Sequence, residues 1–106
     1  MCGIVGWAGS QKPFSIESFG LALDALSHRG PDHGDYIEIP DQVVLGHRRL
    51  SIVDLDARAN QPMKSRCGRF YLVFNGEIFN HPSLRKRLSQ QGVTFQTSSD
   101  TEVLLE

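Results

Sequence analysis

The chain has 106 residues, enough for one small domain at most. Its 40% hydrophobic and 22% charged residues are ordinary for a soluble globular protein, and a net charge of −1 argues against a nucleic acid or an acidic membrane as the main partner. No apolar run reaches the length of a membrane span, and the first residues lack the basic lead of a signal peptide. The two cysteines form no disulfide framework and have no histidines at metal-ligand spacing, so we expect a cytoplasmic protein without a metal site.

The first half of the chain predicts a strand, a helix and a hairpin. Residues 3–7 form a short apolar run that glycine and serine end. Ser15 is suited to cap a helix over residues 16–27, whose apolar side chains recur at helical spacing. After a loop with glycine and proline, residues 36–39 and 43–45 flank a Pro-Asp turn and predict two antiparallel strands.

The second half predicts further short strands and two helices. Residues 50–53 are apolar and β-branched and precede a polar loop, and strands are predicted over residues 70–74 and 95–97. A helix is expected over 83–91, with proline before it, glycine after it and the basic run 85–87 on its solvent face. Ser99 and Glu102 fit a capping box that opens a last helix, which stops in its second turn. We therefore expect an α+β fold with a largely antiparallel sheet, truncated within its domain.

Cys2 directly follows the initiator methionine, whose removal would leave a thiol and a free α-amino group on one residue. An α-amino group has an ordinary pKa of about 7.7–8.0 and a thiol one of about 8.5, so both can exchange a proton near neutral pH. One residue would then supply both a nucleophile and a base. A cysteine at this position is more often an ordinary strand residue, so the interpretation needs support from the rest of the chain.

That support comes from a series of short motifs. The opening MCGIVG resembles that of class II glutamine amidotransferases, which are N-terminal-nucleophile hydrolases. The strings SHRGPD, GHRRLSIVD, NQPM, FNGEIFNH and FQTSSDTEVLL follow in the order seen in glutamine-hydrolysing asparagine synthetases. The resemblance spans residues 1–105 and implies an αββα sandwich of which residues 1–106 form the N-terminal part.

The resemblance assigns catalytic roles to three residues. Cys2 matches the nucleophile, and Asn75 and Gly76 match the pair that stabilises the oxyanion. Hydrolysis of an amide builds negative charge on the carbonyl oxygen, and an asparagine side chain with the next backbone N–H offers two fixed donors for it. Glycine allows a close backbone approach and unusual dihedral angles. The alternative is an ordinary Asn-Gly hairpin turn.

Three other residues match the substrate-binding positions of the family. Arg49 corresponds to the arginine that holds the α-carboxylate of glutamine, Asp100 to the carboxylate that holds the α-ammonium, and Glu77 to a further contact. A guanidinium presents a planar fork that suits a carboxylate, and the neighbouring Arg48 should point to the other face of the strand. Asp100 could instead only cap the helix that Ser99 opens, and Glu77 could be a surface acid.

The expected reaction is the hydrolysis of L-glutamine to glutamate and ammonia. In a full-length asparagine synthetase, ammonia would reach a C-terminal domain that activates aspartate with ATP and Mg²⁺, and the parent could be a homodimer. Residues 1–106 contain no glycine-rich phosphate loop, so no cofactor is expected in this segment, and alone it should have little activity. The alternatives are an amidotransferase with another acceptor, such as a sugar, and a non-catalytic glutamine-binding module.

Overall fold

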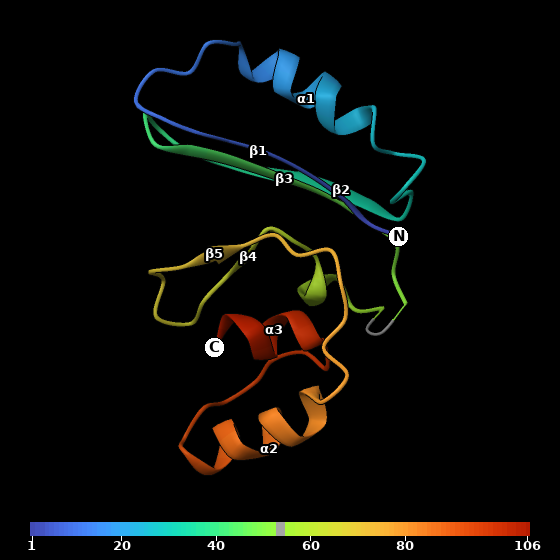
Figure 1. The fold of residues 1–106 in the computed structure, drawn as a ribbon, viewed down its shortest axis with the longest axis vertical. Helices are drawn as coiled ribbons and strands as arrows, with labels where there is room; N and C mark the ends of the chain where they lie inside the picture. Colours follow the sequence, from blue (N-terminus) through green and yellow to red (C-terminus); the bar gives the residue numbers. More distant parts are fainter. Residues whose placement is uncertain (53–54) are drawn as a thin grey trace.

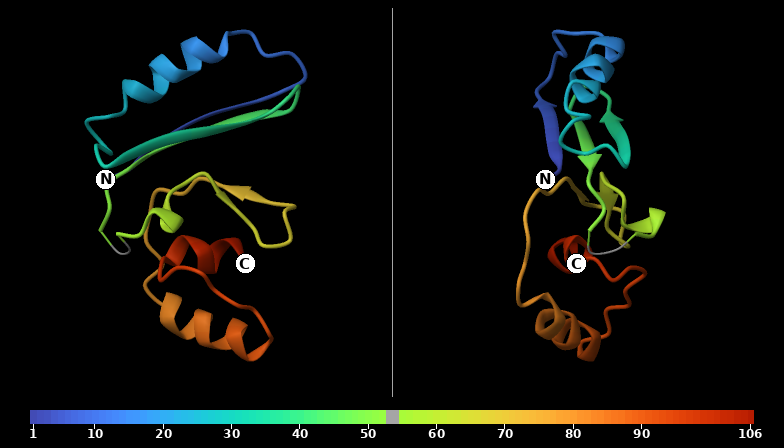
Figure 2. Two further views of the ribbon diagram at one scale, coloured as in Figure 1. Left: turned by 180° about the vertical axis from the view of Figure 1, so that it is seen from behind. Right: turned by 90° about the vertical axis from the view of Figure 1, so that its right-hand side faces the viewer.

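The computed structural model describes residues 1–52 and 55–106. Figure 1 shows four levels along the longest axis: helix α1 (Ile16–Asp24), a three-stranded sheet, a small two-stranded sheet, and finally helices α3 (Asp100–Leu105) and α2 (His81–Gln90). The views in Figure 2 show the same succession. The predicted mixture of helices and antiparallel strands is confirmed.

The larger sheet has the strand order β1-β3-β2, in which β1 (Gly3–Ala8) and β2 (His33–Ile39) both pair antiparallel with the central β3 (Val43–Arg49). The predicted hairpin is therefore confirmed, and its strands are longer than expected. Side chains alternate between the two faces of a strand, so residues 44, 46 and 48 of β3 face helix α1 and residues 45, 47 and 49 face the second sheet. This alternation decides which residues of β3 can reach the site between the sheets.

Helix α1 covers the outer face of this sheet. The Ser15 side chain accepts a hydrogen bond from the Ser18 N–H (3.2 Å), as predicted for the cap, but the helix ends at Asp24, three residues before the expected end. Its buried side chains Phe19 and Leu23 lie on Gly46 of β3, where a Cβ atom would come within 3.0 Å of the Phe19 ring. A glycine at this position lets the helix lie close to the strand.

The second sheet is much shorter than its sequence suggests. Strand β4 (Met63–Lys64) pairs antiparallel with β5 (Tyr71–Leu72), and the rest of the predicted strand 70–74 has no ladder. The N–H and C=O groups of Phe74 are instead bound by the side chains of Gln61 and His47. A short 3₁₀ helix, η1 (Ala57–Ala59), precedes β4.

Helix α2 begins two residues before the predicted start and is followed, as expected, by Gly92, whose φ is +95°. The basic run 85–87 is not all on the solvent face. The guanidinium of Arg85 donates to the carbonyl groups of Thr97 (2.8 Å) and Ser99 (2.8 Å), and it lies 4.4 Å from the centre of the Phe95 ring. This arginine therefore holds α2 against the segment that leads into α3.

Helix α3 is capped by Ser99, whose hydroxyl accepts from the Glu102 N–H (3.2 Å). The Ser99 N–H donates to the Thr97 hydroxyl (3.2 Å), whereas in a capping box it would bind the Glu102 carboxylate. This carboxylate accepts instead from the N–H groups of Gln96 (2.9 Å) and Thr97 (2.8 Å). The prediction of a strand over 95–97 is wrong for this reason, because these N–H groups bind a side chain rather than a neighbouring strand.

Residues 50–52, the described part of the apolar and β-branched run 50–53, are not in a strand, because β3 ends at Arg49. Val53 lies outside the described residues. Within residues 1–52 and 55–106, no helix is long and apolar enough to cross a membrane, and no group of three or more potential metal ligands comes together.

Candidate active site

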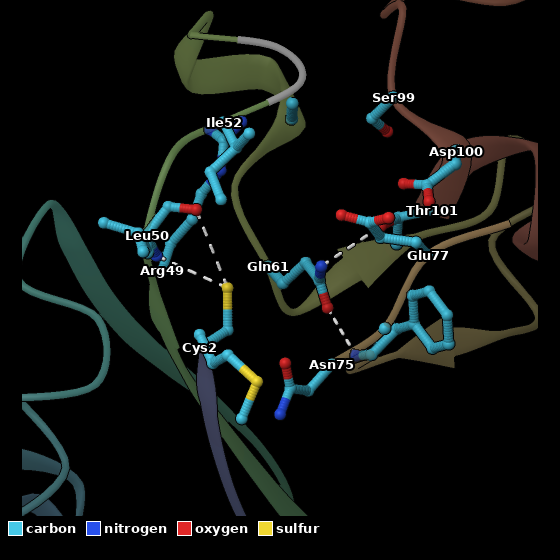
Figure 3. Close-up of a pocket in the computed structure, with 14 residues that line it drawn as sticks. Cys2, Arg49, Leu50, Ile52, Gln61, Asn75, Glu77, Ser99, Asp100 and Thr101 are labelled. Carbon is cyan, nitrogen blue, oxygen red and sulfur yellow. Dashed lines mark hydrogen bonds between the residues drawn. The ribbon is translucent and has the colours of Figure 1, made fainter. Parts of the chain in front are cut away.

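A cavity of about 170 Å³ opens between the two sheets, next to the N-terminal end of α3 (Figure 3). Its wall includes every residue that the sequence suggested for catalysis or substrate binding. These residues are Cys2, Arg49, Asn75, Gly76, Glu77 and Asp100. Cys2 directly precedes β1 of the three-stranded sheet, and Arg49 is the last residue of β3 in the same sheet. The other four residues lie between the end of β5 and the first residue of α3. Side chains separated by up to 98 positions in the sequence thus share one small space.

Cys2 immediately precedes β1 and is half-buried. Its sulfur accepts a hydrogen bond from the Leu50 N–H (3.3 Å) and lies 3.8 Å from the Leu50 carbonyl oxygen. The Cys2 carbonyl accepts from the Nε–H group of Arg29 (3.1 Å). Figure 3 shows the sulfur directed toward the cavity, held beside the end of β3. Met1 also lines the cavity and is 75% exposed.

Arg49, the last residue of β3, is buried and lies on the cavity side of the sheet. Its Nη1 group donates to the Asp56 carbonyl (3.1 Å) and to the Asn60 side-chain oxygen (2.7 Å), which fix the guanidinium from the side of η1. Arg48 points to the opposite face, where its Nε–H donates to the Gly30 carbonyl (2.9 Å). The two adjacent arginines therefore lie on opposite faces of the sheet, and of this pair Arg49 is the one that lines the cavity.

Asp100, the first residue of α3, supplies negative charge across the cavity from Arg49. It is buried, and its Oδ2 atom accepts from the Ile78 N–H (2.9 Å), while Ser99 caps the helix. Asp100 is therefore not the capping residue, and its other carboxylate oxygen is available to a ligand at the wall. Glu77 adds a second, exposed carboxyl group at the edge of the cavity.

Asn75 and Gly76 follow β5 and lead into α2 without a return strand. The hairpin-turn alternative is wrong, because the one strand that pairs with β5 among residues 1–52 and 55–106 is β4, which precedes it in the chain. The Asn75 side chain points toward the Cys2 side of the cavity (Figure 3). Gly76 is not among the glycines with positive φ, and a Cβ atom at this position would lie 2.9 Å from the Phe74 ring, in keeping with the close approach expected from the sequence.

Two residues of the site were not singled out from the sequence. Gln61 is buried, lines the cavity and joins Phe74 to Thr101 through its amide group. His47 lies behind the cavity wall, fully buried, and its Nε2–H donates to the Phe74 carbonyl (3.3 Å). Burial lowers the pKa of His47 to about 4, assisted by the nearby positive charge of Arg49, so the ring is neutral at physiological pH. His47 could have been found from the sequence, because it shares the strand face of Arg49 two residues away.

Residues 1–106 match a family model described as a glutamine amidotransferase domain. The chain belongs to this family. It is 38% identical over 109 aligned positions to asparagine synthetase [glutamine-hydrolyzing] 3 of Bacillus subtilis, covering 99% of this chain and 17% of that protein. It is 41% identical to asparagine synthetase B [glutamine-hydrolyzing] of Escherichia coli, covering 99% of this chain and 19% of that protein.

The chain is also similar to a protein whose name is not that of a synthetase. The chain is 35% identical to the amidase chyE of Penicillium rubens, over 92% of this chain and 14% of that protein. The chain thus spans less than a fifth of the length of each of these three relatives. The family membership therefore applies to residues 1–106.

Proposed function

We propose that this domain hydrolyses L-glutamine to glutamate and ammonia, with Cys2 as the nucleophile. The observation that carries the proposal is the cavity itself, which joins a cysteine at the second position to an arginine and an aspartate from opposite layers. A free amino acid has an α-carboxylate and an α-ammonium group, and two opposite charges on facing walls match this pair. We assign the α-carboxylate to Arg49 and the α-ammonium to Asp100, with Glu77 as a further contact.

The reaction begins after removal of Met1, which frees the α-amino group of Cys2. The sulfur attacks the side-chain amide carbon of glutamine, and the thiol proton passes to this amino group. The proton then moves to the amide nitrogen, the carbon–nitrogen bond breaks, and ammonia leaves. Water attacks the resulting thioester, which releases glutamate and restores the thiol. The Leu50 N–H that binds the sulfur holds the nucleophile in place during both steps.

Asn75 and Gly76 stabilise the negative charge that forms on the amide oxygen. The side-chain NH₂ of Asn75 and the backbone N–H of Gly76 would be the two donors, since both residues line the same cavity as Cys2. Such preorganised donors act only when the oxyanion forms, and they are strongest in a site that excludes water. Both residues are exposed here, so bound substrate would itself complete the enclosure.

In the full-length protein, we propose that this domain is the first part of an αββα sandwich and delivers ammonia to a C-terminal synthetase domain. That domain would make asparagine from aspartate with ATP and Mg²⁺. The similarity to the amidase chyE favours a second candidate, in which the same glutaminase feeds a different acceptor. The two candidates differ only in the product that accumulates when full-length protein is supplied with glutamine, ATP and aspartate.

Replacement of the nucleophile tests the proposal. Cys2→Ala in the full-length protein should abolish glutamate release from glutamine and leave ammonia-dependent synthesis intact. Cys67→Ala is the matched control, because this second cysteine is exposed and lies outside the cavity wall. Intact-mass measurement should show the loss of Met1 in active protein. Continued glutamate release by Cys2→Ala, or an active protein that retains Met1, would refute the mechanism.

A further inference from the structure

The main chain of Phe74, directly before the proposed oxyanion pair, is held by two buried side chains from different parts of the fold. Gln61 accepts from the Phe74 N–H through Oε1 at 2.5 Å. His47 donates to the Phe74 carbonyl through Nε2 at 3.3 Å. Together these bonds fix the peptide units on both sides of the Phe74 α-carbon, and the second unit contains the N–H of Asn75. The position of Asn75 is therefore set by side chains rather than by a strand ladder.

Gln61 has a second contact that His47 lacks. Its Nε2 group donates to the Thr101 hydroxyl (3.2 Å) in the first turn of α3, next to Asp100. This turn is anchored independently, since Ser99 caps it and Arg85 binds the Ser99 carbonyl. Gln61 therefore links the Phe74 main chain by two hydrogen bonds to a helix end whose position is fixed by other contacts.

The burial of Gln61 makes this connection costly to break. The residue is only 6% exposed, so an amide group without partners would stay unsatisfied in the protein interior. Both ends of the amide are bound, and their roles are distinct, because Phe74 offers a donor and Thr101 an acceptor. A side chain of the same length without polar atoms would fill the space and lose both bonds.

We propose that Gln61 is a positioning residue that holds Asn75 and Gly76 at the correct place relative to Cys2 and the bound substrate. The proposal rests on the proposed glutaminase function and extends it to a residue behind the reacting groups. Gln61 acts through Phe74 on the oxyanion donors, whereas the charged substrate contacts Arg49 and Asp100 have their own anchors. Its loss should therefore slow the chemical step and spare the binding of glutamine.

The test compares Gln61→Met with wild type in the full-length protein. We expect kcat for glutamate release to fall by about 10- to 10²-fold, since a displacement of about 1 Å at reacting groups can cost on the order of 10² in rate. The Kd for L-glutamine, measured by calorimetry in the Cys2→Ala background, should change by less than about twofold, well below the tenfold that 1.4 kcal/mol would give. Alkylation of Cys2 by iodoacetamide needs no oxyanion donors and should keep its wild-type rate.

A second pair of variants tests the other end of the connection. Thr101→Val removes the hydroxyl that anchors Gln61 and should lower kcat by about 3- to 10-fold, as expected for one hydrogen bond. Thr101→Ser keeps the hydroxyl and should retain wild-type kcat. If Gln61→Met fails to fold, this pair decides the question.

An unchanged kcat in folded Gln61→Met would overturn the proposal, as would a raised Kd with kcat intact, because the residue would then shape the substrate contacts. Equal kcat values for Thr101→Val and Thr101→Ser would overturn it as well. Failure of the proposed function is distinguishable from these results. It would appear as glutamate release that survives Cys2→Ala, whatever the Gln61 variants do.

Discussion

Arg48 and Arg49 offer an internal comparison, because adjacent arginines on one strand face opposite sides of the sheet. Arg49→Lys replaces a buried guanidinium whose Nη1 group is already bound to Asp56 and Asn60. Under the proposed assignment, the Nε and Nη2 groups would form the bidentate pair with the substrate carboxylate. A lysine has a compact ammonium group and cannot form both sets of bonds at once.

The expected magnitude follows from the lost bonds. A hydrogen bond to a charged group contributes about 1.5–3 kcal/mol, and each 1.4 kcal/mol corresponds to a factor of ten in affinity. Arg49→Lys should therefore weaken glutamine binding by about 10- to 10²-fold. Arg48→Lys should leave binding unchanged, because Arg48 bonds to Gly30 on the face covered by α1.

The assay is calorimetric titration of L-glutamine into each arginine variant in the Cys2→Ala background, together with KM from glutamate release. Thermal unfolding of both variants separates a binding defect from a folding defect. A larger effect on Kd from Arg48→Lys than from Arg49→Lys would refute the assignment of the strand faces. Equal, small effects would show that Arg49 only anchors the segment before β4 and does not contact the substrate.

Three other predictions concern the oxyanion pair, the entry to α3 and acid stability. Asn75→Ala should lower kcat for glutamate release by about 10²–10³-fold, with Asn80→Ala in the exposed loop as control; an unchanged kcat would remove Asn75 from the mechanism. Glu102→Gln should destabilise the fold by about 1–3 kcal/mol in urea unfolding, because its buried carboxylate accepts from Gln96 and Thr97; a wild-type midpoint would contradict this. The free energy of unfolding should decrease as the pH falls from 6.5 to about 4, because in this range the His47 side chain takes up a proton in the unfolded chain but not in the folded protein. The decrease is roughly 3 kcal/mol at its full extent, and His47→Gln should abolish this pH dependence.

Local signals in the sequence predicted much of the fold. Ser15 and Ser99 cap helices as expected, and the turn between β2 and β3 lies where Pro40 and Asp41 indicated it. These predictions succeeded because a cap or a tight turn depends on a few neighbouring residues. Side-chain chemistry at short range was therefore sufficient to define those boundaries.

The predictions that failed concern backbone groups whose partners are distant or unexpected. The segments 70–74 and 95–97 have the composition of strands, but the backbone groups of Phe74 bind Gln61 and His47, and those of Gln96 and Thr97 bind Glu102. Strand propensity describes how a side chain fits a pleated surface and does not identify the partner of each N–H group. Only the three-dimensional structure shows that a buried polar side chain has replaced the neighbouring strand.

The same reasoning explains what the sequence could indicate about the site. Motifs suggested the chemistry of Cys2, Arg49 and Asp100 one residue at a time, and the alternation along β3 separated Arg49 from Arg48. The sequence did not indicate what connects the layers on which these residues lie. In the structure, His47 joins the central strand to Phe74, and Gln61 joins Phe74 to α3. Buried polar side chains thus cross between the layers that carry the proposed nucleophile and the proposed substrate contacts, which ties the geometry of the site to the packing of the fold.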